Sequence, residues 1–487
     1  MEHNGGVQDA AEVTDIPASS VPKGGKKEET FRVGTLVYTK LGLMYLFIWL
    51  LWGDFCFHIM EFAMPGVLSV NIKGMGASNT ITALFITTIP AFLNATVNPV
   101  ISFKSDRMRT KWGRRIPILF IATPPITLFL IAIGYSREIG GWLQHTVGGL
   151  VGTSPTSMTL GFLGFAIIGF QFFNMFTSSV FYYLFNDVVP ETHLARCMSL
   201  FRVVGSLASS AYSFFVLKYA QTHMQAILLG AALLYFVAFM VMCFTVKEGE
   251  YPPPSPLIGN KTGLIAQIRT YAVECFTHKY YWYFYLTNTF YSGMGAIGAF
   301  GLLFSMSLGL DLGIIGKIGG IAGIISTILL YPAGMISDKY HALRTMLVAA
   351  AATILVSSVS LMWLFIPDPS YKLVLTVSIV TGIIGLPFGT LYNAASMPMY
   401  MRLLPKDRYG QFGSADAIIR SVALIIFSLL AGKYLDFFKS YYHGNEFYYR
   451  WIPVWTISFQ IMSLFFLWKL YQEWKRLGGD KDFVPPP

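Results

Sequence analysis

The chain has 487 residues, of which 54% are hydrophobic and only 12% are charged, and its mean hydropathy is +0.55. This composition excludes a soluble enzyme and is typical of a membrane protein with many spanning segments. The formal net charge of +10 does not indicate nucleic-acid binding, because the basic residues cluster in short loops between apolar segments.

The N-terminal stretch is polar, mixed in charge and lacks the apolar core of a signal peptide. We therefore expect a disordered cytoplasmic tail over residues 1–35. Four scattered cysteines follow, with no CxxC pair, so neither a disulfide framework, a metal site nor any cofactor is expected. These cysteines are Cys56, Cys197, Cys243 and Cys275.

Six apolar segments of spanning length precede a hydrophilic, proline-bearing stretch at residues 247–279, and six follow it. This pattern predicts an all-α membrane protein with twelve transmembrane helices, in two six-helix bundles at residues 36–246 and 280–472, and a tail at 473–487. The segments fall near residues 38–63, 79–103, 116–135, 159–185, 198–218, 225–246, 280–308, 313–336, 344–366, 372–401, 412–435 and 449–472.

Basic residues concentrate before the first segment, in the loops after the second, eighth and tenth segments, in the central stretch and in the C-terminal tail. With twelve helices, all of these lie on one side of the membrane. The positive-inside rule then predicts that both termini are cytoplasmic, in a multi-pass protein of the plasma or inner membrane.

The first segment carries Asp54, His58 and Glu61 at spacings of four and three residues, which places them on one helical face. An ionisable group in mid-membrane costs about 2.5–3.5 kcal/mol and usually faces a cavity or a partner. The pattern therefore predicts a polar path through the membrane. As an alternative, Glu61 lies at the interface and His58 is a packing residue. Trp49 and Trp52 lie within a turn of Asp54, where they would suit a sugar ring or pack against neighbouring helices.

The two halves of the chain repeat a pattern of loops. SDRMRTKWGRR in the first half corresponds to SDKYHALR in the second, and FNDVVPETHLAR corresponds to MRLLPKDRYGQ. Internal repeats of this kind are typical of secondary transporters. The charged loops are expected to latch the halves in one state and release them in another, although basic loops can also serve only topology. We expect Asp106 to pair with arginines and to cap the next helix. The gating candidates are Asp106, Arg107, Arg109, Arg115, Asp187, Arg196, Arg202, Asp338 and Arg344.

Further polar side chains in the apolar segments supply the neutral donors and acceptors that a polyol needs. Each could equally make an interhelical hydrogen bond. Asp416 and Arg420 are four residues apart and could form an ion pair that breaks during transport or is static. Glycine clusters at residues 293–301 and 313–323 are interpreted as packing sites. The neutral candidates for substrate binding are Gln171, Asn174, Tyr182, Asn288, Tyr291 and Asn393.

The SDRMRTKWGRR loop resembles the signature of the major facilitator superfamily, in the variant of the glycoside–pentoside–hexuronide cation symporters and the related sucrose transporters. The resemblance covers about residues 40–473. It implies that Asp54, in WGDF, is a sugar-binding aspartate. The segment NATVNPVISFKSDR is similar to the one in which the melibiose permease branch has two cation-binding aspartates, but here Asn94 and Asn98 stand at those positions. A further carboxylate of that branch falls near Tyr182, and Arg420 stands where the family often has a lysine.

Hard cations such as sodium prefer several anionic oxygens, so the two asparagines argue against a sodium site. A proton needs one carboxylate, and Asp54 is the first candidate, followed by Glu61, His58 and Asp416. The expected function is proton-coupled symport of a glycoside or oligosaccharide by a monomer in contact with membrane lipids. The alternatives are transport of a lipid-like amphiphile or another solute, an uncoupled sugar facilitator, or a membrane sensor without transport. A membrane enzyme is not expected, because no nucleophile–base pair is visible.

Overall fold

The computed structural model describes residues 30–148, 152, 154–251, 271–405 and 408–486. Within them, twelve helices are long and apolar enough to cross a membrane, which confirms the expected number. Residues 1–29, which are expected to be disordered, and most of the central hydrophilic stretch lie outside the described residues.

The spans of the N-terminal bundle begin with one long helix, and two of them contain short π- or 3₁₀-helical pieces. They are α1 (Lys40–Gly74), then α2 (Asn79–Ala83) with η1 (Leu84–Thr88), α3 (Ile89–Thr96) and α4 (Asn98–Arg107), then α5 (Ile116–Gly134), α8 (Pro155–Val188), α9 (Glu191–Ala211) with η3 (Tyr212–Val216) and η4 (Leu217–Tyr219), and α10 (Met224–Thr245). A short α6 (Ser136–Leu143) and η2 (Gln144–Gly148) lie in the loop before α8.

The C-terminal bundle is built in the same way. Its spans are α12 (Lys279–Gly295) with η5 (Gly298–Phe300) and α13 (Gly301–Ser307), then α14 (Leu312–Tyr340), α15 (Ala342–Ser358) with η6 (Val359–Leu364), α16 (Tyr371–Leu403), α17 (Tyr409–Tyr441), and η7 (Glu446–Trp451) with α18 (Ile452–Arg476). A final turn, α19 (Gly479–Asp482), follows.

Two elements differ from the sequence-based expectation. Residues 30–39 form an antiparallel hairpin of β1 (Thr30–Val33) and β2 (Leu36–Thr39), inside and next to the segment expected to be disordered. Gly34 allows the turn because its φ is +54°, and Phe31 packs edge-on against His193 at 4.7 Å. The first helix also continues beyond Pro65 to Gly74, because its last turns are apolar and buried in the bundle.

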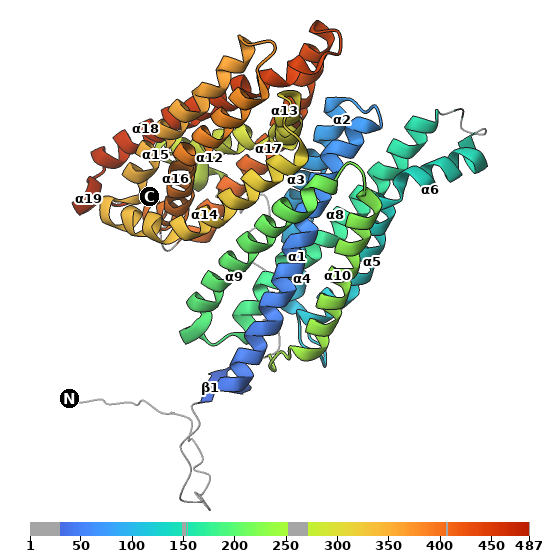
Figure 1. Ribbon diagram of the computed structural model, residues 1–487. Helices are drawn as coiled ribbons and strands as arrows, with labels where there is room; N and C mark the ends of the chain where they lie inside the picture. Colours follow the sequence, from blue (N-terminus) through green and yellow to red (C-terminus); the bar gives the residue numbers. More distant parts are fainter. Residues whose placement is uncertain (1–29, 149–151, 153, 252–270, 406–407, 487) are drawn as a thin grey trace, which may run out of the picture.

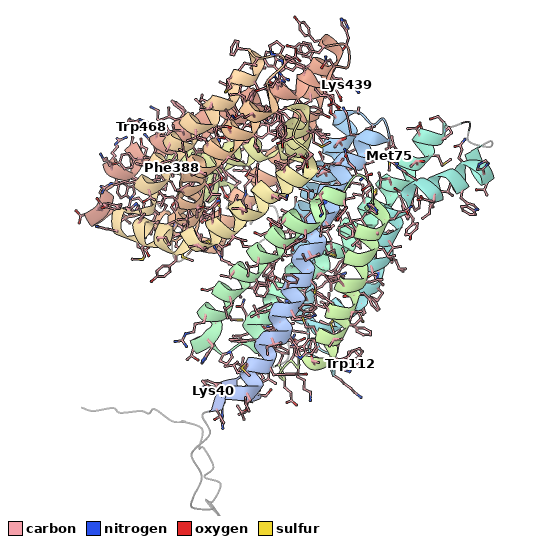
Figure 2. The ribbon with its side chains drawn as sticks, viewed as in Figure 1. Lys40, Met75, Trp112, Phe388, Lys439 and Trp468 are labelled. Carbon is pink, nitrogen blue, oxygen red and sulfur yellow. The ribbon has the colours of Figure 1, made fainter. Side chains whose placement is uncertain are left out.

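The two bundles meet at one end and diverge toward the other (Figure 1). We call the end that carries Lys40 and Trp112 the tail side, and the end that carries Met75 and Lys439 the far side (Figure 2). The hydrogen bonds that join the bundles at Lys73, Asn79, Thr80, Thr88 and Ser206 lie between the far side and the middle of the spans. The protein is therefore closed on the far side and open on the tail side.

Small residues allow the bundles to approach closely along α14. Gly316 lies against the carbonyl of Ser213, and Gly323 lies against the Ser210 hydroxyl, so that a Cβ atom at either glycine would collide. Nearer the middle of the span, the hydroxyls of Ser206 and Thr327 are 2.5 Å apart. The glycine cluster at residues 313–323 is thus a packing site, as expected.

A carboxylate closes the far side. Asp436 of α17 accepts hydrogen bonds from the backbone N–H groups of Asn79 and Thr80, both at 2.9 Å, and from their side chains at 2.9 and 2.6 Å. Beside it, Lys73 contacts the Tyr448 hydroxyl and lies about 5 Å from the ring centres of Tyr448 and Tyr449. Asp436 therefore joins the C-terminal bundle to the start of the second span of the N-terminal bundle.

Substituting Asp436→Asn should shift the protein toward states open on the far side. An asparagine retains one acceptor oxygen and turns an NH₂ group toward N–H donors, and each lost charge-assisted bond is worth about 1.5–3 kcal/mol. We expect the open population to rise about tenfold or more, measured as distances between spin labels on the exposed faces of α6 and α17. Asp311→Asn is the control, since Asp311 caps its own helix at Gly313 N–H, 2.8 Å away; an equal shift in this control would contradict the assignment.

Candidate functional site

The predicted acidic face of α1 forms a cluster in the structure. Asp54 is fully buried. The His58 Nε2 atom lies 3.3 Å from Asp54 Oδ1, and its Nδ1 atom lies 3.8 Å from Glu61 Oε2. Nevertheless, neither carboxylate oxygen of Asp54 accepts a hydrogen bond within the described part of the chain. A buried carboxylate without a hydrogen bond is costly, so this position is suited to a group that brings a proton or a hydroxyl donor.

Neighbouring helices hold this cluster in place. The His58 ring packs on Gly205 of α9, where an added Cβ would lie 2.6 Å from the ring. The Asn174 amide of α8 faces Glu61. Tyr182 of α8 lies close enough to Asp54 and Glu61 to interact electrostatically with both. His58 thus lies between the two acids, although its Nδ1 atom makes no hydrogen bond with any residue that the structure describes.

The predicted aromatic and amide neighbours separate into different environments. Trp52 is 43% exposed and stacks on Phe55 at 6.0 Å. Trp49 instead contacts Tyr45 edge-on, and its indole N–H has no partner among the described residues. Gln171 is buried on α8, one turn from Asn174.

The two asparagines of the second span are hydrogen-bonded to each other. Asn98 donates to Asn94 at 3.0 Å, and the Ser179 hydroxyl of α8 donates to the Asn98 oxygen. These neutral groups satisfy one another at the positions where the resembled branch has carboxylates.

A second buried acid lies in the C-terminal bundle. Asp416 accepts hydrogen bonds from the Asn288 amide at 3.1 Å and from the Tyr400 hydroxyl at 2.5 Å. Arg420 lies 3.9 Å from the same carboxylate, and its side chain is 43% exposed. The predicted pair therefore exists, but Asn288 and Tyr400 rather than Arg420 make the short contacts, so Asp416 is satisfied where Asp54 is not.

Of the remaining predicted substrate-binding residues of this bundle, Tyr291 lines a small cavity, and Asn393 lies beside it as a hydrogen-bond partner of Tyr291. Tyr291 donates to Asn393 at 3.3 Å and stacks on Tyr392 with ring centres 4.5 Å apart. Tyr291 and Tyr392 border a cavity of about 60 Å³ together with Gln460. The Tyr392 hydroxyl and the Gln460 oxygen are buried without a partner in the described part of the chain, so the cavity offers polar groups to water or to a ligand.

A clamp of two arginines and two aspartates lies at the tail side of the N-terminal bundle. Asp187 at the end of α8 accepts bonds from Arg114 at 2.9 and 2.5 Å and from Arg115 at 3.0 Å. Arg115, which is only 4% exposed, also binds Asp106 and Ser105, each at 2.5 Å. The hydrogen bond to Asp187 raises the pKa of Arg114, so that guanidinium stays charged. Asp106 therefore pairs with one arginine, as expected, and Asp187 pairs with two.

The prediction that Asp106 also caps the next helix is wrong. Glu248, just after α10, accepts the N–H groups of Arg114, Arg115 and Ile116 at 3.0, 2.8 and 2.6 Å. Asp106 is mostly exposed at the end of α4 and turns to Arg115 instead. Gly113, with φ +104°, leaves room for Glu248, which a Cβ would displace.

The other predicted gating residues are scattered. Arg109 donates to the carbonyls of Asp106 and Met108, both at 2.8 Å, within its own loop, and Arg107 lies at the last position of α4. Arg196 and Arg202 are exposed on α9. In the C-terminal bundle, Asp338 pairs with Arg402 at 3.0 Å and Arg344 pairs with Asp480. None of these ion pairs in the described residues joins the two bundles.

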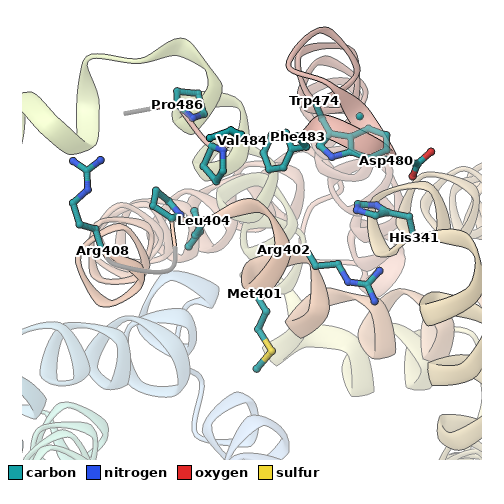
Figure 3. A pocket seen from close by; sticks show the side chains of 13 residues that line it. His341, Met401, Arg402, Leu404, Arg408, Trp474, Asp480, Phe483, Val484 and Pro486 are labelled. Carbon is teal, nitrogen blue, oxygen red and sulfur yellow. The ribbon is translucent and has the colours of Figure 1, made fainter.

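A tail-side cavity of about 580 Å³ lies in the C-terminal bundle (Figure 3). Its lining includes His341, Arg402 and Arg408, with Trp474 and the last described residues of the chain. Burial, followed by the nearby Arg402, lowers the pKa of His341. None of the predicted substrate-binding residues lines this cavity, so it is separate from the candidate site.

Comparison with known protein families identifies the family to which this chain belongs. Residues 146–428 match the model of the Major Facilitator Superfamily. The chain belongs to this superfamily. No curated protein sequence matches it significantly.

Several solved structures have the same fold as this major facilitator protein over most of its length. A D-xylose-proton symporter has a TM-score of 0.63 at 13% identity, covering 88% of this chain and 98% of that one. The nucleoside transporter NupG has a TM-score of 0.59 at 15% identity, covering 88% and 99%. A bacterial homolog of the human lysosomal transporter Spinster, in an inward-facing and occupied conformation, has a TM-score of 0.62 at 14% identity. The match covers 91% of this chain and 99% of that one. At these identities, the likenesses establish the fold alone.

Proposed function

We propose that this transporter is a proton-coupled symporter of a glycoside or oligosaccharide that works by alternating access. The observation that carries the proposal is Asp54, a buried acid with no hydrogen bond in the described part of the chain, adjacent to His58 and Glu61. Such a group can take up a proton or bind a sugar hydroxyl, and each event would change the cost of the other. The resemblance of WGDF to the sugar-binding stretch of the glycoside symporters supports the same role.

The surroundings of Asp54 suit a sugar. Trp52 and Tyr182 are partly exposed and present aromatic surface, and Asn174 adds an amide beside Glu61. From the other bundle, Arg420, Tyr291 and Asn393 would supply further hydrogen bonds once the bundles close around the ligand. We assign proton coupling first to Asp54, then to His58 and Glu61, because Asp416 already has two hydrogen bonds.

The distribution of basic residues indicates how the protein is oriented in the membrane. Lysines and arginines concentrate in the loops and tails of the tail side, which would make that side cytoplasmic. The structure then corresponds to the inward-open state, with Asp436 closing the outer gate. Gating would break the Asp436 contacts while new contacts form between the tail-side ends of the bundles.

Proteoliposomes provide the test. We would measure uptake of labelled disaccharides with and without an inward proton gradient, and would vary sodium separately. Accumulation driven by the proton gradient alone is expected. Sodium dependence would contradict the coupling, equilibration without accumulation would indicate a facilitator, and no sugar movement by the folded protein would contradict the substrate class and favour an amphiphile.

A further inference from the structure

A surface cavity of about 380 Å³ lies at the tail side of the N-terminal bundle, where the start of α5 meets the end of α10. Two lysines border it, Lys111 from the loop before α5 and Lys247 from the segment after α10. The rest of the lining is mostly apolar and consists of Trp112, Ile116, Cys243, Phe244, Val246 and Glu248.

The positive charges at this cavity are not neutralised. Lys111 and Lys247 are both exposed, and neither forms an ion pair with any residue that the structure describes. Glu248 is the one carboxylate in the lining, and both of its oxygens are already occupied. They accept the N–H groups at the start of α5 and, at 2.8 Å, the Tyr251 hydroxyl. An anion at the rim would therefore meet two free ammonium groups.

An exposed apolar surface leads away from the lysines along the bundle. Trp112 is 52% exposed and Phe244 is 64% exposed. Their rings and that of Phe120 form an edge-to-face cluster, with centres 5.5 to 6.3 Å apart. Val237 and Leu233 continue the exposed apolar stripe along the same side of α10. On a membrane-spanning bundle, such a stripe faces lipid acyl chains.

We propose that this cavity is a binding site for an anionic phospholipid. The phosphate binds between Lys111 and Lys247, the Trp112 indole lies at the boundary between headgroups and acyl chains, and one acyl chain follows Phe244 and Val237. A lipid is favoured over a soluble anion because the charged rim is continuous with the exposed apolar stripe. The ligand would sit beside Glu248 and hence next to the clamp of Asp187, Arg114 and Arg115.

Quenching of Trp112 fluorescence by brominated lipids tests the site. The full-length protein would be placed in nanodiscs containing brominated phosphatidylglycerol or brominated phosphatidylcholine, and the Trp112→Phe variant would identify the Trp112 signal. Because a lysine near the surface contributes about 1 kcal/mol toward an anionic lipid, we expect a preference for phosphatidylglycerol of about thirtyfold, or fivefold for each lysine.

Matched double variants keep the test specific. Lys111→Gln with Lys247→Gln should abolish the preference, whereas Lys339→Gln with Lys475→Gln, which removes two exposed tail-side charges elsewhere, should retain it. Equal quenching by the two lipids in the unmodified protein would overturn the proposal, as would a preference that survives in the first double variant. Loss of the preference on adding inorganic phosphate would assign the site to a soluble anion and also overturn it.

Discussion

Replacing Asp54 by asparagine is expected to reduce gradient-driven sugar accumulation to the level of passive equilibration. The substitution keeps the size of the side chain but removes the one buried acid that lacks a hydrogen bond in the described part of the chain. The amide cannot take up and release a proton, so the gradient can no longer drive the cycle. Uptake into proteoliposomes, measured with and without the gradient, gives the result directly.

Exchange of labelled sugar at equal concentrations on both sides separates coupling from binding. If Asp54 serves only coupling, exchange persists in Asp54→Asn; if it also holds the sugar, exchange falls with accumulation. Asp368→Asn, an exposed acid on the far side, serves as the control and should accumulate sugar normally. Full accumulation by the folded Asp54→Asn protein would disprove the assignment.

The largest loss of stability is expected for Asp187→Asn. Asp187 is almost buried and binds two arginines, and Arg115 is only 4% exposed. Removing one partner of a buried pair leaves an uncompensated charge, which typically costs about 3–5 kcal/mol. Unfolding in mixed micelles, titrated with a denaturing detergent, should show a loss of that size.

Asp338→Asn provides a matched control in the second half of the chain. Asp338 also pairs with an arginine, but it is 72% exposed, and exposed pairs contribute at most about 1 kcal/mol. Similar losses in the two variants would mean that burial of the Asp187 clamp has no energetic importance.

Much of the fold follows from local patterns. The number of helices follows from apolar segments of spanning length, and the cluster of Asp54, His58 and Glu61 follows from their spacing on one face. The pairing of Asp106 with an arginine and the packing role of the α14 glycines were expected, because each signal lies within one short stretch of the chain.

The missed features depend on contacts between distant parts of the chain. Glu248 binds N–H groups more than 130 positions earlier, and Asp436 binds Asn79 and Thr80 across the two bundles. Nothing in the local pattern around these acids distinguishes them from ordinary surface carboxylates. The open tail side is likewise not encoded in any one segment, because the same helices must also pack in the opposite state.

The chemistry of the far-side seam has a consequence for the speed of the transport cycle. Its hydrogen bonds come from hydroxyls, amides, Asp436 and Lys73. Apolar contacts accompany them, since Ala83 shares a cluster with Ile297 and Phe300, and Leu312 belongs to the core of the N-terminal bundle. When such a seam parts, water can replace each bond nearly one for one. A seam of leucines would instead expose oily surface and resist opening in proportion to its area. The polar part of the seam can therefore open at little cost, whereas the apolar part stabilises the closed state.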